Sequence, residues 1–188
     1  EEDNLSKEMV FPKVVKKGDT IGLVAPASPI PKENISKCQE VVESLGYKVV
    51  MGDSADKTYL GYLSGDDDVR AKDINAMFER EDIDGVFCLR GGYGCCRIVD
   101  KLDLDLIRAN PKVFVGYSDV TILHLVFNQL CHMVTFHGPM VSSNMISQFD
   151  DYTQKSFMDT LSMGGELEFQ NPQGKNIETL NDGHGTGR

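Results

Sequence analysis

The stretch Pro111–Thr121, P-K-V-F-V-G-Y-S-D-V-T, joins two different patterns at one sharp break. Its apolar run Val113–Val115 is typical of a short buried strand, and a helix-like apolar segment continues from Val120. A strand that turns directly into a helix lifts the turn residue, here Ser118, above the carboxyl edge of a sheet. The free N–H groups of the helix then point at whatever lies there. Two interpretations of Ser118 are open: it is a nucleophile, or it only caps the helix.

Runs of strand length alternate with amphipathic segments along the rest of the chain. The expected strands are Thr20–Ala25, Tyr47–Met51, Asp84–Leu89, Lys112–Val115 and Met133–Phe136. The expected helices are Lys32–Leu45, Asp66–Arg80, Ile98–Ala109 with a break near Lys101, a segment from the Ser118 turn to about Leu130, and Asp151–Leu161. This alternation predicts an α/β fold, flavodoxin-like or Rossmann-like, with a mostly parallel sheet and helices on both faces. The start of a second domain follows.

The loops after the first, third, fourth and fifth strands should meet at the carboxyl edge of that sheet, where open α/β sheets bind ligands. One of them is the glycine loop, Arg90–Gly94, with the sequence R-G-G-Y-G. Glycines lack a Cβ, so their backbone can approach a substrate closely and adopt positive φ. The glycine loop can equally be a tight turn or a generic anion-binding loop.

Composition narrows the class of protein. The formal net charge of −10 over 188 residues argues against nucleic acid and anionic membrane surfaces as partners. No apolar run approaches the length of a membrane span, and residues 1–9 lack the basic and apolar regions of a signal peptide. The five cysteines, two of them adjacent, suit neither a disulfide framework nor a zinc site. Reduced thiols of a cytoplasmic protein are expected, with Cys95 either reactive or packed beneath the glycine loop.

The four histidines do not supply an evident general base. His124 lies nearly two helical turns beyond Ser118, so we expect it to point away from the turn and to pack partly buried. His132 should start the fifth strand at the far edge of the sheet, and His184 should be solvent-exposed in a glycine-rich tail. His137 should leave the fifth strand at the ligand edge, where it could contact a substrate or brace the loop.

Four motifs in order resemble the LD-carboxypeptidase family, the muramoyltetrapeptide carboxypeptidases, which are serine peptidases. They are Lys17–Ile21 with Val24–Ser28, then Arg90–Gly94, Gly116–Asp119 and His137–Met140. The α/β-hydrolase elbow G-x-S-x-G does not fit, because Val120 stands where its second glycine is needed. The resemblance favours the nucleophile interpretation of Ser118 over the cap, although one residue can serve as both.

The resemblance implies a reaction in which Ser118 attacks the LD-peptide bond that releases terminal D-alanine from a muropeptide tetrapeptide, L-Ala-D-Glu-diamino acid-D-Ala. It assigns this reaction to cytoplasmic recycling of cell-wall peptides and suggests a homodimer. It also points to the backbone N–H groups of Gly92 and Asp119 as the oxyanion hole. No metal or organic cofactor is required.

Three further residues are candidates for substrate contacts: Gly91, Arg90 and His137. Arg90 could pair with a substrate carboxylate, or it could form a structural salt bridge instead.

The resemblance further implies a Ser-Glu-His triad whose Glu and His lie in a C-terminal domain with no counterpart in this sequence. We therefore expect a tail at residues 1–10, the nucleophile-bearing domain at 11–165, and a linker with the beginning of a truncated C-terminal domain at 166–188. Such a fragment should be inactive on its own.

Two rival functions remain open. One is a peptidase of the same family that confers immunity by cleaving a peptidyl-nucleotide antibiotic. The other is a non-catalytic flavodoxin-like domain that binds a phosphate or carboxylate at the glycine loop and the Ser118 helix. Against the second, no G-x-G-x-x-G follows the first strand.

Overall fold

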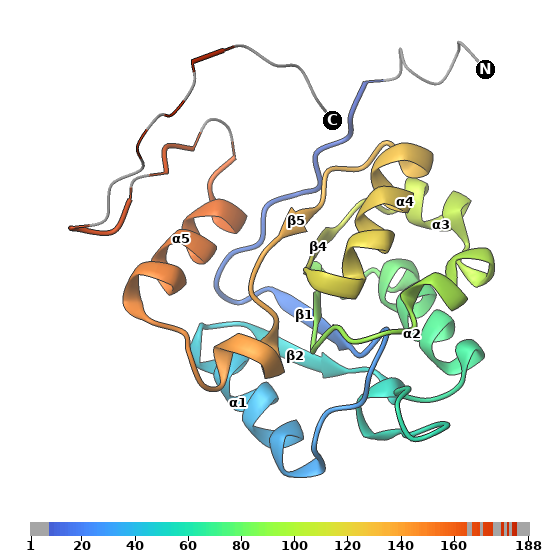
Figure 1. The fold of residues 1–188 in the computed structure, drawn as a ribbon. Helices are drawn as coiled ribbons and strands as arrows, with labels where there is room; N and C mark the ends of the chain where they lie inside the picture. The colour runs from blue at the N-terminus through green and yellow to red at the C-terminus, as the bar shows by residue number, and fades with distance from the viewer. Residues whose placement is uncertain are drawn as a thin grey trace.

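Five parallel strands form the central sheet of the structure, a computed structural model that describes residues 8–164, 167–169, 171–174, 178, 180, 182 and 183. In chain order they are β1 (Thr20–Val24), β2 (Lys48–Met51), β3 (Gly85–Cys88), β4 (Val113–Gly116) and β5 (Phe136–His137). Their order across the sheet is β2-β1-β3-β4-β5, and every neighbouring pair is parallel. This is the flavodoxin-like order, which changes direction between β1 and β3. The predicted α/β class and parallel sheet are confirmed (Figure 1).

Helices cover both faces of the sheet, as the sequence predicts (Figure 1). On one face an apolar cluster buries the inner sides of α2 (Asp67–Glu79), α3 (Leu104–Ala109) and α4 (Thr121–Cys131). On the other face a second cluster buries the inner sides of α1 (Ile35–Ser44) and α5 (Asp151–Ser162). Alternate residues of β3 enter the two clusters, so this strand is buried on both faces.

Short helical turns connect these elements. They are η2 (Lys32–Asn34), η3 (Asp53–Asp56), η4 (Cys95–Arg97), η5 (Val99–Lys101), η6 (Ser118–Val120) and the π-helical η7 (Val141–Met145). The sequence pattern does not predict η7. Within the described ranges, none of the helices combines the length and the apolar character needed to traverse a bilayer.

The predicted fifth strand is displaced. We expected Met133–Phe136, but β5 comprises only Phe136 and His137, which pair with Val115 and Gly116 of β4. The backbone before β5 pairs elsewhere: the N–H of Val134 donates to the carbonyl of Val10 at 2.9 Å, and Val10 forms a parallel bridge with Met133.

His132 does not start a strand, contrary to the prediction. It ends α4 as the C-cap, with the left-handed φ of 54°, and its side chain is buried. A left-handed C-cap reverses the chain at the end of a helix, so the extended segment can begin only after it.

The predicted break near Lys101 is confirmed. The chain forms η5 there and starts a new helix, α3, because the Asp103 side chain accepts a hydrogen bond from the N–H of Leu106 at 2.9 Å. The acidic opening of the preceding helix behaves similarly, since Asp66 caps α2 by accepting from the N–H of Val69.

Much of the expected linker at 166–188, including His184, lies outside the described residues.

Phe114 of β4 lies at the centre of the core, and its replacement should reveal how much the core stabilises the fold. Its ring is fully buried and packs edge-on against Phe127 at 5.0 Å between centroids, with Phe78 also in contact. We expect Phe114→Ala to lower the free energy of unfolding by about 3–5 kcal/mol in urea titrations.

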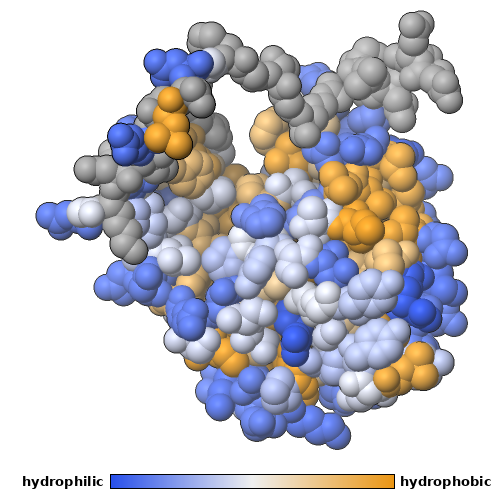
Figure 2. Space-filling view, in the orientation of Figure 1, coloured by the Kyte–Doolittle hydropathy of each residue, from blue (hydrophilic) through white to orange (hydrophobic). Residues whose placement is uncertain are grey.

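Leu125→Ala provides the control. Leu125 is 51% exposed on α4, over which Figure 2 shows an apolar surface, so its removal should change the free energy of unfolding by only about 0.5 kcal/mol. Equal losses in the two variants would contradict the assigned core.

Candidate active site

The serine corner, Gly116–Asp119, holds Ser118 in a strained conformation. Its φ is 61°, in the left-handed region that costs a non-glycine residue about 1–2 kcal/mol. The Ser118 side chain is exposed and not packed beneath the sheet. Ser118 opens η6, whereas the N-cap positions of η6 and α4 are Tyr117 and Val120, and neither carries a side-chain cap. Ser118 therefore does not occupy the capping position.

Gly116 makes the sharp corner possible. A Cβ at this position would lie 2.7 Å from Val120 Cγ1 and 3.2 Å from Cys88 Cβ. Only a residue without a side chain lets the chain fold back against its own next turn while β4 stays packed on β3.

The glycine loop touches the serine corner. A Cβ on Gly91 would lie 3.1 Å from Ser118 Cβ, 3.3 Å from Ser118 Oγ and 3.4 Å from the backbone nitrogen of Asp119. Gly92 has a φ of 129°, and a Cβ there would lie 2.0 Å from Ser28 Oγ. Residue 92 must therefore be glycine for two independent reasons, conformation and space.

Loops from three adjacent strands thus meet at the carboxyl edge. The N–H of Ser28, after β1, donates to the carbonyl of Gly91, after β3, at 3.3 Å, and Gly91 lies against Ser118, after β4. These loops lie at the carboxyl edge beside the switch between β1 and β3, the region where doubly wound sheets bind ligands. Among the described residues, no hydrogen-bond acceptor engages the backbone N–H of Gly92 or of Asp119.

Arg90 and His137, after β3 and at the end of β5, make different contacts. Arg90 is half-buried, and its Nη1 donates to the carbonyl of Pro29 at 3.1 Å, which braces the loop after β1. Among the described residues it pairs with no carboxylate. His137 is exposed at the end of β5, with its ring 5.9 Å from that of Tyr117 and 6.2 Å from that of His124.

His124 is partly buried, as predicted, but it does not point away from the corner. Its Nε2 lies 2.8 Å from the carbonyl of Gly116 and its Nδ1 lies 2.9 Å from Thr135 Oγ1. A helical side chain leans toward the N-terminus of its helix, which brings the ring back to the end of β4. Because a carbonyl only accepts, Nε2 carries the proton, and burial lowers the pKa of His124. Both ring nitrogens are therefore engaged in a neutral structural role.

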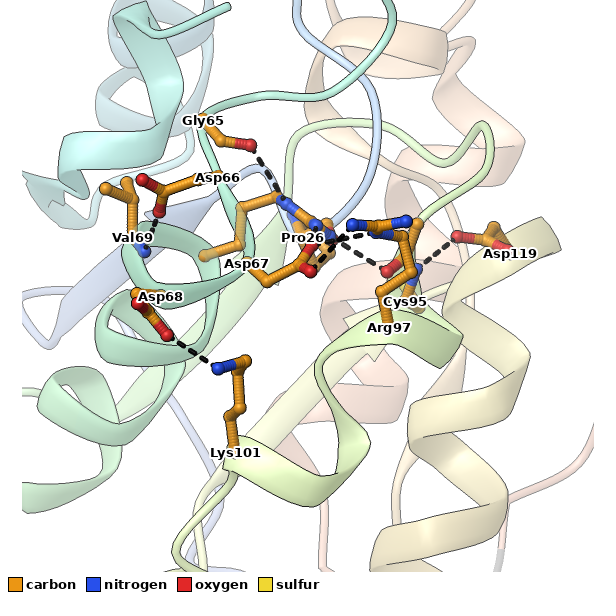
Figure 3. A network of polar contacts seen from close by, with 12 residues as sticks. Pro26, Gly65, Asp66, Asp67, Asp68, Val69, Cys95, Arg97, Lys101 and Asp119 are labelled. Carbon is orange, nitrogen blue, oxygen red and sulfur yellow. Dashed lines mark hydrogen bonds and ion pairs between the residues drawn. The ribbon is translucent and has the colours of Figure 1, made fainter. Parts of the chain in front are cut away.

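Cys95 packs beneath the glycine loop, as one of the two interpretations predicts. It is fully buried, and burial raises the pKa of its thiol, which disfavours the reactive thiolate. All five cysteines are free. The N–H of Cys95 donates to Asp119 Oδ2 at 2.8 Å, a link from the glycine loop to the serine corner that the sequence does not reveal (Figure 3).

The sequence analysis also missed Arg70. Its guanidinium is fully buried beside the glycine loop and donates to the carbonyls of Pro26 and Gly94, each at 2.8 Å. A signal was present, because Arg70 precedes Ile74 and Met77 on the apolar stripe of α2, where a charged side chain requires a buried partner.

These features define an α/β domain that presents an exposed serine at a strained strand-to-helix turn. Residues 21–138 match the family model described as LD-carboxypeptidase N-terminal domain, of peptidase family S66. The chain belongs to the LD-carboxypeptidase family, and the match includes Ser28, the glycine loop and the serine corner.

Individual relatives agree with this assignment. A probable murein peptide carboxypeptidase of Bacillus subtilis is 44% identical over 134 residues, which are 71% of this chain and 42% of that protein. The structure of a muramoyltetrapeptide carboxypeptidase from Oxalobacter formigenes superposes with a TM-score of 0.69 at 29% identity, over 77% of this chain and 48% of the other.

A third relative has a different name. The microcin C7 self-immunity protein MccF, in complex with aspartyl sulfamoyl adenosine, superposes with a TM-score of 0.80 at 27% identity, over 87% of this chain and 51% of the other. The chain spans about half the length of the relatives it matches.

The strain at Ser118 predicts a stability difference between two substitutions. Glycine adopts the left-handed region freely whereas alanine does not, so we expect Ser118→Gly to be roughly 0.5–1 kcal/mol more stable than Ser118→Ala in urea titrations. The alanine variant is the matched control, because both lack the hydroxyl. A less stable glycine variant would mean that Ser118 is not held at positive φ.

Proposed function

We propose that this chain carries the nucleophile of a serine peptidase that hydrolyses an LD-peptide bond and releases terminal D-alanine from muropeptide tetrapeptides. The observation that carries the proposal is the exposed Ser118 on a strained corner, in contact with Gly91 of the glycine loop. The names of two relatives, a murein peptide carboxypeptidase and a muramoyltetrapeptide carboxypeptidase, support the substrate class.

In this mechanism Ser118 Oγ attacks the carbonyl carbon of the diamino acid at its L-centre, and its proton passes to a general base. The negative charge that develops on the carbonyl oxygen is stabilised by the backbone N–H groups of Gly92 and Asp119. D-alanine leaves with the proton from the protonated base, and water then hydrolyses the acyl-enzyme. The contact between Gly91 and Ser118 supports this arrangement, since Gly92 follows Gly91 and Asp119 follows Ser118, and among the described residues neither of their N–H groups has an acceptor.

The general base is the triad His, which the triad Glu orients. Both residues belong to the C-terminal domain, outside this sequence. The histidines near the site support this division. His124 uses both ring nitrogens within the fold, and His132 is buried at the opposite end of α4. His137 is exposed at the end of β5 and contacts substrate, together with the backbone of Gly91.

Arg90 binds a carboxylate of the substrate in the same proposal. One of its donors is used by the Pro29 carbonyl, which fixes the guanidinium, and the remaining donors stay available. The proposal also includes the domain division expected above, with residues 11–165 as the nucleophile-bearing domain and 166–188 leading into the next. In this proposal the protein is cytoplasmic and forms a homodimer.

The likeness to MccF favours a second candidate function, cleavage of a peptidyl-nucleotide by the same nucleophile. Ser118 and the oxyanion donors act identically in both reactions, so only the substrate pocket differs. Assays with a muropeptide tetrapeptide and with an aminoacyl sulfamoyl nucleoside, run in parallel, separate the two.

The nucleophile assignment predicts that Ser118→Ala abolishes D-alanine release by the full-length protein, with a loss of about 10⁴-fold or more in kcat. Release is measured by coupled D-amino-acid oxidation, and circular dichroism checks that the domain remains folded. Ser36→Ala, an exposed serine on α1, is the control and should retain full activity. Full activity in Ser118→Ala would exclude the nucleophile role.

The proposed division of the triad predicts that residues 1–188 alone do not turn over the tetrapeptide, because the base is absent. The same coupled assay, applied to the folded fragment and to the full-length protein at equal concentration, measures this. Robust turnover by the fragment would place the base within it, with His137 the first residue to test.

A further inference from the structure

The Gly94–Cys95 peptide, at the end of the glycine loop, is held at both of its polar atoms. Its carbonyl oxygen accepts from Arg70 Nη1 at 2.8 Å, and its N–H donates to Asp119 Oδ2 at 2.8 Å (Figure 3). One peptide therefore connects α2 to the serine corner. The fit is close, since a Cβ on Gly94 would lie 2.6 Å from Leu63 Cδ2 and 2.9 Å from Arg70 Nη1.

Arg70 fixes this peptide to the rest of the domain. Its Nη1 also donates to the carbonyl of Pro26 at 2.8 Å, its Nε donates to that of Gly65 at 3.3 Å, and its Nη2 pairs with Asp67. The loop after β1, the start of α2 and the glycine loop thus share one buried guanidinium. The Arg70 guanidinium is fully buried, and its partners are three backbone carbonyls and one carboxylate. It therefore has little freedom to move.

The network continues to the surface. Asp67 accepts from Arg97 Nε at 2.9 Å and Nη2 at 2.8 Å, and Arg97 lies in η4, directly after the glycine loop (Figure 3). Hydrogen bonding by Arg97 lowers the pKa of Asp67 and keeps it ionised beside Arg70. Because the Arg97 side chain is 38% exposed, this outer pair can be broken without opening the core.

We propose that Arg70 and the Asp119 carboxylate are positioning residues, which set the Gly92 N–H relative to Ser118 Oγ through the Gly94–Cys95 peptide. The glycine loop follows β3 and the serine corner follows β4, so an alignment between them needs a direct link, and the Asp119 carboxylate provides it. Catalytic groups must be held within roughly 0.5 Å of their productive positions. The inference rests on the proposed function.

The first test compares Asp119→Ala with Asp119→Asn in the full-length protein, since both keep the backbone N–H of residue 119. The alanine variant removes the acceptor of the Cys95 N–H, and kcat should fall by about 10²–10³ with KM changed less than about threefold. The asparagine oxygen can still accept, so kcat should return to within about tenfold of wild type. Equal kcat losses in the two variants, or no loss in either, would overturn the proposal.

The second test breaks two ion pairs at the start of α2, of which only the Arg97–Asp67 pair belongs to the network that holds the glycine loop. Arg97→Gln removes the pair with Asp67, and the control Lys101→Gln removes the pair with Asp68, 2.8 Å long and on the same helical turn. The two replaced side chains are similarly exposed, Arg97 at 38% and Lys101 at 40%, so both variants should show only small changes in melting temperature. Only Arg97→Gln should lower kcat, by about three- to tenfold. Equal kcat values in the two variants would contradict the proposed network.

A readout without turnover separates this inference from the proposed function. Hydrogen exchange of the backbone amides of residues 90–97, measured by mass spectrometry, should accelerate in Asp119→Ala and Arg97→Gln but not in Lys101→Gln. If the wild-type protein releases no D-alanine, the proposed function fails and this exchange pattern alone decides the positioning role. Unchanged exchange in Asp119→Ala would overturn that role.

Discussion

The close approach of two backbone segments, the glycine loop and the serine corner, governs the geometry of the candidate site. A side chain has no room at Gly92, where a Cβ would lie 2.0 Å from Ser28 Oγ, and little at Gly91, where it would press on Ser118. The loops after β1, β3 and β4 can meet only because these positions lack a Cβ. Positive φ at Ser118 then turns the hydroxyl outward, at a conformational cost that the packed sheet beneath it sustains.

Parallel topology explains why so much of this arrangement could be predicted from the sequence. Once the strands are known to be parallel, every loop that follows a strand must lie at the same edge, and the adjacency of β3 and β4 then brings the glycine loop and Ser118 together. The strand and helix order follows from apolar periodicity, and the break before α3 follows from a capping aspartate at Asp103. The catalytic roles assigned to Ser118, Gly92 and Asp119 stay predictions.

Features that depend on tertiary contacts could not be predicted from the sequence. His132 adopts a left-handed cap and the backbone next to it pairs with Val10, which leaves β5 shorter and later than its apolar run indicates. His124 returns to Gly116 because of the lean of helical side chains, which spacing along the helix does not convey. The buried Arg70 lies on the apolar stripe of α2, but its carbonyl partners, distant in sequence, could not be predicted.

An acyl-enzyme would test the central claim most directly, since it requires that Ser118 Oγ become covalently bonded to substrate. The full-length protein is mixed with a muropeptide tetrapeptide, quenched in acid during turnover, digested, and its peptides are analysed by mass spectrometry. We expect the muropeptide tripeptide as an adduct on the peptide that contains Ser118, with D-alanine released in equal amount during the first turnover. An adduct on another residue would contradict Ser118 as the nucleophile.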